Sequence, residues 1–239
     1  MAKIKVKVPP LITKSCLTTG FPAVNLIEFK LSSYEDEENA ATLGGGTSAK
    51  AQRELLYRAL VGQKIGDTTD RLLHHDGSSI AAYESWHPDL RTFYASAYSN
   101  YHDCGKAIPA AVVKARTTKV TAGKHVIYVY TVPKSVIDDV KKMGGVCPTS
   151  FGMRIASGEN ELAAMEVAGE SPLRYLRALV RITLAEQNGE PISDAEDVCK
   201  AWHPKARNLA LAIAALSLRS GADADFFSQE GNVEISQDE

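Results

Sequence analysis

The sequence has no large excess of either charge and no long apolar run. Its 27 basic and 29 acidic residues give a formal net charge of −2, so no global field attracts nucleic acid or an anionic membrane, although a local basic groove remains compatible with this balance. The longest apolar run, residues 209–218, is about half of a membrane span. The start of the chain is interrupted by Pro9 and Pro10 and lacks the apolar run of a signal peptide. We therefore expect a protein without membrane contact.

Closely spaced cysteines are also absent. The four cysteines are Cys16, Cys104, Cys147 and Cys199. Zinc sites and redox motifs need close pairs, so we expect reduced thiols and an intracellular site of work. His74, His75 and Asp76 form a local group of metal-ligand residue types, but adjacent side chains on a strand point to opposite faces, and no distant ligand pair completes a site. We expect a polar loop over residues 67–77 and no metal.

The 239 residues, 44% apolar and 23% charged, are typical of an ordinary globular protein with a sizeable core. Residues 1–50 combine a β-like start with prolines and end at Gly44-Gly45-Gly46, which predicts an N-terminal arm with one or two strands. The main domain is expected over residues 51–220, followed by a flexible acidic tail over residues 221–239. Whether residues 1–50 recognise a target or complete the fold stays open.

Local patterns predict a mixture of helices and strands. The expected helices cover residues 48–54, 101–116, 134–143, 194–201 and 207–219. The expected strands cover residues 55–61, 90–99, 125–133, 161–165 and 177–184. The clearest strand is residues 125–133, because it is β-branched and aromatic throughout and closes at Pro133.

The tripeptide Glu159-Asn160-Glu161 is the stretch with the most chemical promise. On a strand, Glu159 and Glu161 project from the same face with Cα atoms roughly 6.6 Å apart. Two like charges so close are costly unless a cation or a reacting centre uses them. The alternative is that residues 158–161 open a solvated helix or cross a surface loop.

Three sequence motifs occur in a suggestive order. They are Leu56-Tyr57-Arg58-Ala59 early in the chain, Phe93-Tyr94-Ala95-Ser96-Ala97 in the middle, and Glu159-Asn160-Glu161 late. This order resembles the Arg, Ser and Glu-x-Glu motifs of mono-ADP-ribosyltransferases, especially the enzymatic subunits of the cholera and pertussis toxin group. The resemblance covers roughly residues 55–184. It implies an α+β fold, with an ADP-ribosyltransferase-like split β-sandwich around an NAD cleft and flanking helices.

The resemblance assigns a role to each charged residue. Glu161 is expected to stabilise the oxocarbenium-like centre that forms when the nicotinamide–ribose bond of NAD breaks. Glu159 is expected beside the acceptor, where it polarises or deprotonates the incoming nucleophile. Arg58 is expected to hold the pyrophosphate of NAD with paired hydrogen bonds.

Neutral residues complete the implied site. The family's first serine orients the catalytic glutamate, and here Ser96 or Ser99 takes that place, because the family's Ser-Thr-Ser is replaced by Ala95-Ser96-Ala97. Tyr57 accompanies the early arginine, and Tyr98 is a candidate to stack on NAD, although aromatic residues on strands are more often part of a core.

The function implied by the resemblance is an NAD-dependent mono-ADP-ribosyltransferase, of the toxin, effector or phage-type modifier class. It transfers ADP-ribose from NAD, its substrate, to a macromolecule, with a protein arginine as the first expectation. The expected site of action is the cytoplasm, which the protein reaches by export or injection when another cell is the target. A cognate inhibitor or antitoxin is an expected partner. Two alternatives stay open. One is an enzyme of this fold that modifies nucleic acid, with a basic groove beside Glu159, and the other is a noncatalytic binding protein that retains the fold.

Overall fold

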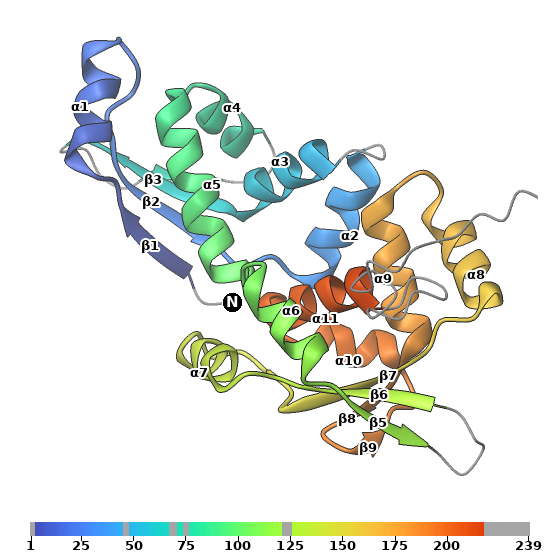
Figure 1. The fold of residues 1–239 in the computed structure, drawn as a ribbon. Coiled ribbons are helices and arrows are strands. Elements are labelled where there is room, and N and C mark those ends of the chain that lie inside the picture. The colour runs from blue at the N-terminus through green and yellow to red at the C-terminus, as the bar shows by residue number, and fades with distance from the viewer. Residues whose placement is uncertain (1–2, 45–47, 67–70, 74–76, 121–125, 218–239) are drawn as a thin grey trace, which may run out of the picture.

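The computed structural model describes residues 3–44, 48–66, 71–73, 77–120 and 126–217, and these form two lobes (Figure 1). The N-terminal lobe is built on a four-stranded antiparallel sheet in the order β1-β2-β3-β4. Its strands are β1 (Lys3–Lys7), β2 (Val24–Lys30), β3 (Leu60–Ile65) and β4 (Arg71–Leu72).

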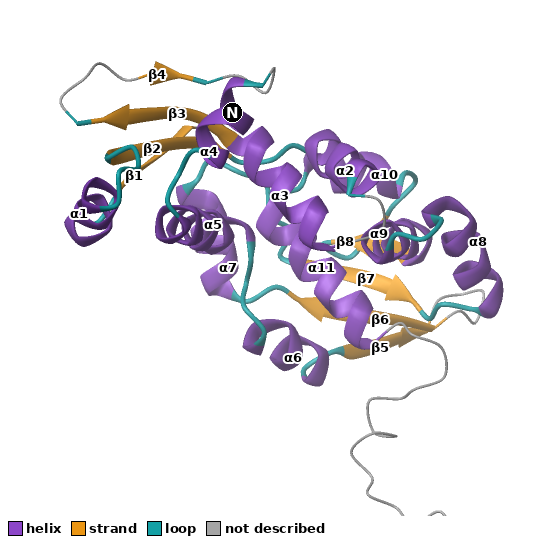
Figure 2. Ribbon diagram, turned by 90° about the horizontal axis from the view of Figure 1, so that it is seen from above, coloured by secondary structure: helices purple, strands orange, loops and turns teal. Residues whose placement is uncertain are grey.

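One face of this sheet carries the helices of the N-terminal lobe (Figure 2). These helices are α1 (Pro10–Thr18), α3 (Ser48–Ala59), α4 (Ser78–Glu84) and α5 (Pro88–His102). The core between sheet and helices is rich in aromatic rings: Phe29 of β2 makes an edge contact with Tyr94 of α5, and Trp86 does the same from the turn before α5. Trp86 also donates a 2.8 Å hydrogen bond to Gln63, which fixes the indole against β3.

The C-terminal lobe is built on a five-stranded antiparallel sheet in the order β5-β6-β7-β8-β9. Its strands are β5 (Thr117–Val120), β6 (Val126–Thr131), β7 (Ser150–Arg154), β8 (Leu184–Gln187) and β9 (Glu190–Pro191). Its helices are α6 (Ala107–Lys114), α7 (Lys134–Lys142), α8 (Gly158–Ala168), α9 (Pro172–Thr183), α10 (Ala195–Ala201) and α11 (Pro204–Ser217). Tyr130, Phe151 and Trp202 form the aromatic centre of this second core.

The helix α2 (Tyr34–Leu43) joins the two lobes, because it contacts α3 on one side and α9 on the other. Its Glu37 is buried and binds Arg177 of α9 and Arg207 of α11. Residues 3–43 therefore complete the fold, since β1 and β2 supply half of the first sheet and α2 lies in the junction. They do not form a separate arm.

The coarse prediction of an α+β protein is confirmed, since the structure combines helices with two antiparallel sheets. Four predicted elements are also confirmed with small boundary shifts, namely those seen as β6, α7, α10 and α11. The predicted helix over residues 101–116 is found only in part, as the end of α5 and the separate α6. All four cysteines are free thiols. Of the polar loop predicted over residues 67–77, Arg71 and Leu72 form β4, whereas His74, His75 and Asp76 lie outside the described residues. The predicted tail over residues 221–239 also lies outside them.

Four predicted strands are wrong, because the structure has helices there. Residues 55–59 continue α3, residues 90–99 lie within α5, residues 161–165 lie within α8, and residues 177–183 lie within α9. In α5 the buried Leu90, Tyr94 and Tyr98 recur every four residues, which is a helical period, and Pro88 occupies the first turn, where its missing N–H is not needed. The aromatic content of residues 90–99 favours a strand, but the four-residue spacing of the buried side chains agrees with the observed helix.

The helices at residues 161–165 and 177–183, where strands were predicted, are also explained by local sequence signals. The backbone N–H of Arg174 donates to the hydroxyl of Ser171, and Pro172 follows as the first helical residue, so α9 starts with an N-cap and a proline at N1. In α8, Ser157 and Asn160 form a reciprocal capping box. Both helices therefore have clear start signals, which in α9 outweigh the β-branched residues Val180, Ile182 and Thr183.

Candidate functional site

The two candidate catalytic carboxylates lie in the first turn of α8. Glu159 is exposed and Glu161 is half-buried. Acidic side chains in the first turn of a helix are stabilised by the positive end of the helix dipole. The closeness of Glu159 and Glu161 is therefore explained without a reacting centre. The alternative that residues 158–161 open a solvated helix is confirmed.

Arg58, the candidate pyrophosphate ligand, lies in the last turn of α3 and is held by acidic neighbours. Its Nε donates to Glu54 at 2.9 Å, and its Nη1 lies 3.9 Å from Asp36 of α2. These contacts point the guanidinium toward the α2–α3 contact, on the opposite side of α3 from Arg53 and Glu84.

Tyr98 is a core residue of α5 rather than a stacking platform. It is 4% exposed, its hydroxyl forms a hydrogen bond with that of Ser32, and its ring stacks on His102 with centroids 3.9 Å apart. Burial raises the pKa of Tyr98 far above its ordinary value. Ser99, the alternative serine, lies one turn before Asp103, whose backbone N–H donates to the Ser99 carbonyl at 2.7 Å.

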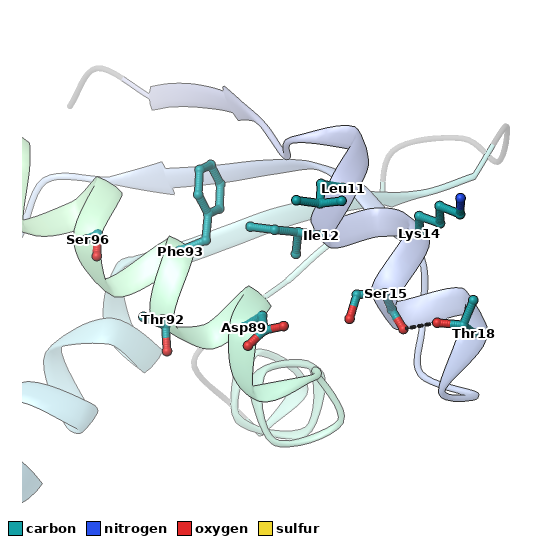
Figure 3. A pocket seen from close by; sticks show the side chains of 9 residues that line it. All are labelled: Leu11, Ile12, Lys14, Ser15, Thr18, Asp89, Thr92, Phe93 and Ser96. Carbon is teal, nitrogen blue, oxygen red and sulfur yellow. Dashed lines mark hydrogen bonds between the residues drawn. The ribbon is translucent and has the colours of Figure 1, made fainter.

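Ser96 lies on the exposed side of α5, between two hollows of the N-terminal lobe. The first, which we call the α1–α5 groove, has a volume of about 810 Å³ (Figure 3). The second, the α3–α5 hollow, has a volume of about 450 Å³. Thr92 and Ser96 line both, so the two hollows flank the same stretch of α5.

The α1–α5 groove combines an apolar wall with hydroxyl groups. Figure 3 shows Leu11 and Ile12 of α1 extending toward Phe93 of α5, while Ser15, Thr18 and Thr92 lie along the other side. Leu11 is 79% exposed, which is unusual for a leucine that faces a groove. Lys14 of α1 and Asp89 of α5 bring opposite charges to the lining of the groove.

The α3–α5 hollow is polar, and two of its lining residues, Arg53 and Arg91, belong to an ion cluster. Arg53 of α3 donates from Nε and Nη2 to Glu84 at the end of α4, and Arg91 of α5 lies 3.7 Å from the second oxygen of that carboxylate. The Tyr57 hydroxyl accepts from Arg53 and donates to Glu84. Arg91 also lies over the ring of Tyr83.

The cluster fixes the charges of its members. The hydrogen bond from Arg53 is the main cause of a lowered pKa at Glu84, which therefore stays ionised. Burial, followed by the contact with Glu84, raises the pKa of Tyr57, which keeps its proton. The cluster thus consists of two guanidinium groups, one carboxylate and a neutral phenol, and its two arginines, Arg53 and Arg91, line the hollow.

The structure relates only two of the six predicted site residues to the α3–α5 hollow. Ser96 lines it, and Tyr57 is connected to it only through its hydrogen bond with the lining residue Arg53. Arg58 and Tyr98 point into other contacts, and α8, which carries Glu159 and Glu161, packs on α9 and lies far from α5 in both views (Figures 1 and 2). The predicted constellation of arginine, serine and two glutamates is therefore not assembled by the described contacts.

The residues that shape these hollows are not among those predicted from the sequence. Arg53 and Glu84 are 31 residues apart in the chain and carry no motif. Leu11 offered one signal: an apolar residue directly after Pro9-Pro10 starts a short helix with little of its surface covered. Among the described residues, no group of three or more histidine, cysteine, aspartate or glutamate side chains is gathered as a metal site.

The described helices also include none that is long and apolar enough to cross a membrane. Comparison with known proteins adds no assignment: no protein-family model, no curated protein and no solved structure matches this chain.

Proposed function

We propose that this chain is a binding protein that takes an amphipathic helix of a partner protein in the α1–α5 groove. The observation that carries the proposal is the exposed apolar wall formed by Leu11, Ile12 and Phe93 between two helices. Helical ligands commonly place apolar residues at positions i, i+3 or i+4 and i+7 into such a groove. This is the noncatalytic alternative of the sequence analysis, now given a surface and a ligand.

The attachment of α1 fits a surface that adapts to its ligand. Cys16 is the only residue of α1 that is fully buried, and Thr13 donates a long 3.3 Å hydrogen bond to the carbonyl of Val24. A helix with few buried contacts moves at low energetic cost. The groove width can therefore adjust to the side chains of a partner helix.

The charges beside the groove favour an acidic flank on the partner. Across α5 from the groove, Arg53 and Arg91 share the single carboxylate of Glu84, so the α3–α5 hollow carries excess positive charge. An acidic residue of the bound helix that reaches over Thr92 and Ser96 meets these guanidinium groups. Such contacts favour orientation and association rate more than affinity.

The first prediction uses two exposed leucines of the same helix. Leu11→Asp places a charge in the groove, whereas Leu17, which is 64% exposed on α1, does not line the groove. We expect helical peptides selected from a displayed amphipathic library to lose at least about tenfold in affinity with Leu11→Asp, because a buried leucine contact is worth roughly 1.5–3 kcal/mol. Leu17→Asp is expected to bind them within about twofold of wild type, measured by fluorescence anisotropy.

Two outcomes of this experiment contradict the proposal. One is the absence of any enriched helical peptide after selection against the wild-type protein. The other is an equal loss of affinity in both variants, which indicates an effect of α1 stability rather than of the groove. Thermal denaturation of each variant separates that second case from a real loss of contact.

ADP-ribosyl transfer is the second candidate, supported by the order of the three motifs and by Ser96, which lines the same hollow as Arg53, the hydrogen-bond partner of Tyr57. In this proposal NAD is the substrate and a macromolecule, first a protein arginine and second a nucleic acid, is the acceptor. The carboxylates of α8 would have to reach NAD bound elsewhere, since their helix packs on α9.

Release of nicotinamide from NAD, with a cell lysate present, tests this second candidate. If Glu161 is the catalytic carboxylate, Glu161→Gln is expected to lose about 100-fold or more in rate, while Glu166→Gln, an exposed change on the same helix, keeps wild-type activity. A wild-type protein that neither binds NAD nor releases nicotinamide rejects the transferase and leaves the helix-binding proposal untouched.

A further inference from the structure

The four-stranded sheet turns one face to its helices and the other to solvent. Along β1, Ile4 and Val6 pack against the core, so the alternating Lys3, Lys5 and Lys7 project from the opposite face. The side chains of Lys3 and Lys5 are 54% and 56% exposed. This solvent-facing surface, which we call the lysine face, lies opposite α1, α3, α4 and α5.

The strand register extends the lysine face over three strands. Lys3 lies opposite Lys30 of β2, and Lys7 lies opposite Leu26, which in turn lies opposite Lys64 of β3. Neighbouring strands are about 4.8 Å apart and alternate residues about 6.7 Å apart. Five lysines thus occupy a patch of roughly 13 Å by 10 Å.

Two carboxylates neutralise part of this patch. Glu28, which is 7% exposed, lies 3.8 Å from Lys3 and 3.9 Å from Lys5. Asp36 binds Lys30 at 3.2 Å. Within the described residues, neither Lys7 nor Lys64 has a carboxylate partner within ion-pair distance. The lysine face is therefore locally basic in a chain whose net charge is −2.

We propose that the lysine face binds the phosphate backbone of a nucleic-acid duplex. A duplex carries one phosphate per about 1.7 Å of its axis when both strands are counted, so a basic patch of roughly 13 Å by 10 Å faces several phosphates at once. Lysine is a common phosphate ligand but is depleted in protein–protein interfaces, which argues against an acidic protein as the partner.

The neutral residues of the lysine face indicate how the duplex is held. Between the lysines lie Leu26, Gly62 and the exposed Leu72, and the described part of this face has no aromatic ring. Stacking on unpaired bases, the usual basis of single-strand binding, has no platform here. Binding is consequently expected to be independent of sequence and strongly dependent on salt.

The test uses Lys7→Gln/Lys64→Gln, because these two lysines can be neutralised without leaving Glu28 or Asp36 unpaired. Binding of a fluorescent mixed-sequence 20-base-pair DNA is measured between 50 and 300 mM salt. We expect the plot of log affinity against log salt to become shallower by about 2 and the affinity at 0.1 M salt to fall roughly 60-fold, since each lost phosphate contact removes about 0.9 from the slope.

The control is Lys50→Gln/Lys114→Gln, which removes the same charge from exposed positions on α3 and α6. It is expected to keep the wild-type slope. Equal losses in both double variants, no duplex binding by wild type at 50 mM salt, or equally tight binding of polyglutamate would each overturn the proposal. The last result would identify an acidic protein as the partner.

Discussion

Glu37→Gln is expected to lower the free energy of unfolding by about 3–5 kcal/mol, because it leaves two buried arginines without their shared counter-ion. Arg207 donates to both oxygens of Glu37, from Nη2 at 2.8 Å and from Nε at 3.2 Å. Arg177 donates to the same carboxylate at 2.5 Å. All three side chains are 4–6% exposed, so water cannot replace the lost contacts.

The surroundings of Glu37 make the network specific as well as strong. Arg207 also donates to the backbone carbonyls of Ser32 and Trp202, and Arg177 binds Glu38 at 2.9 Å. Both guanidinium groups lie near the face of the Tyr34 ring, at 5.8 and 5.9 Å from its centroid. A single carboxylate thus ties α2 to two helices of the C-terminal lobe.

Urea denaturation of Glu37→Gln and Glu35→Gln measures this effect. Both variants remove one charge from the first turn of α2, so their effects on the helix dipole are alike, but Glu35 is exposed. Glu35→Gln is expected to stay within about 0.5 kcal/mol of wild type. A loss below about 1 kcal/mol in Glu37→Gln would contradict the view that this ion cluster stabilises the junction of the lobes.

This cluster also marks what sequence reasoning could not reach. Glu37 is separated by 140 residues from Arg177 and by 170 from Arg207, and no local pattern links such distant charges. The segment that begins at Val126 and runs through α7 was predicted well, because a β-branched run followed by Pro133 determines both elements locally. Locally determined elements were predictable, whereas contacts formed by the tertiary fold were not.

The errors at the candidate site have a related origin. The aromatic and β-branched content of residues 90–99 and 177–184 predicts strands, although their apolar residues follow a helical period. Once α5 and α8 are helices, Ser96 and Glu161 no longer lie on neighbouring strands, and the expected cleft is not formed by them. The ion cluster of Arg53 and Glu84 arises only when α3, α4 and α5 pack together.

Acidification from pH 7 to pH 5 is expected to lower the free energy of unfolding by about 2–4 kcal/mol through two buried histidines. Burial lowers the pKa of His102 to about 3 and that of His203 to about 4, and the charge of Arg207 acts in the same direction on both. Each ring also has a buried Nε2 without a hydrogen-bond partner among the described residues. Both side chains are therefore neutral in the folded protein at pH 5.

The sign follows from the unfolded state, in which each histidine titrates near its ordinary pKa of about 6.5. Below that pH the unfolded chain binds protons that the folded protein does not, so stability falls as the pH decreases toward 4 and 3. The carboxyl groups of Asp36 and Glu84 have lowered pKa values. Their contribution to the free energy of unfolding is therefore lost only below about pH 4, outside this window. Burial raises the pKa of Asp103, which opposes the loss near the acidic end.

His203→Asn separates the histidine effect from general acid sensitivity. His203 precedes Pro204, and its Nδ1 accepts a 3.1 Å hydrogen bond from the backbone N–H of Lys205, which an asparagine oxygen can also accept. The variant is expected to lose about half as much stability as wild type between pH 7 and pH 5, measured by urea denaturation at each pH. The matched control is His87→Asn. His87 also precedes a proline, Pro88, and its Nδ1 accepts a hydrogen bond from the backbone N–H of Asp89. Unlike His203, it has no buried histidine next to it among the described residues. If His203→Asn and wild type lose equal stability, protonation of His203 does not limit folding in acid.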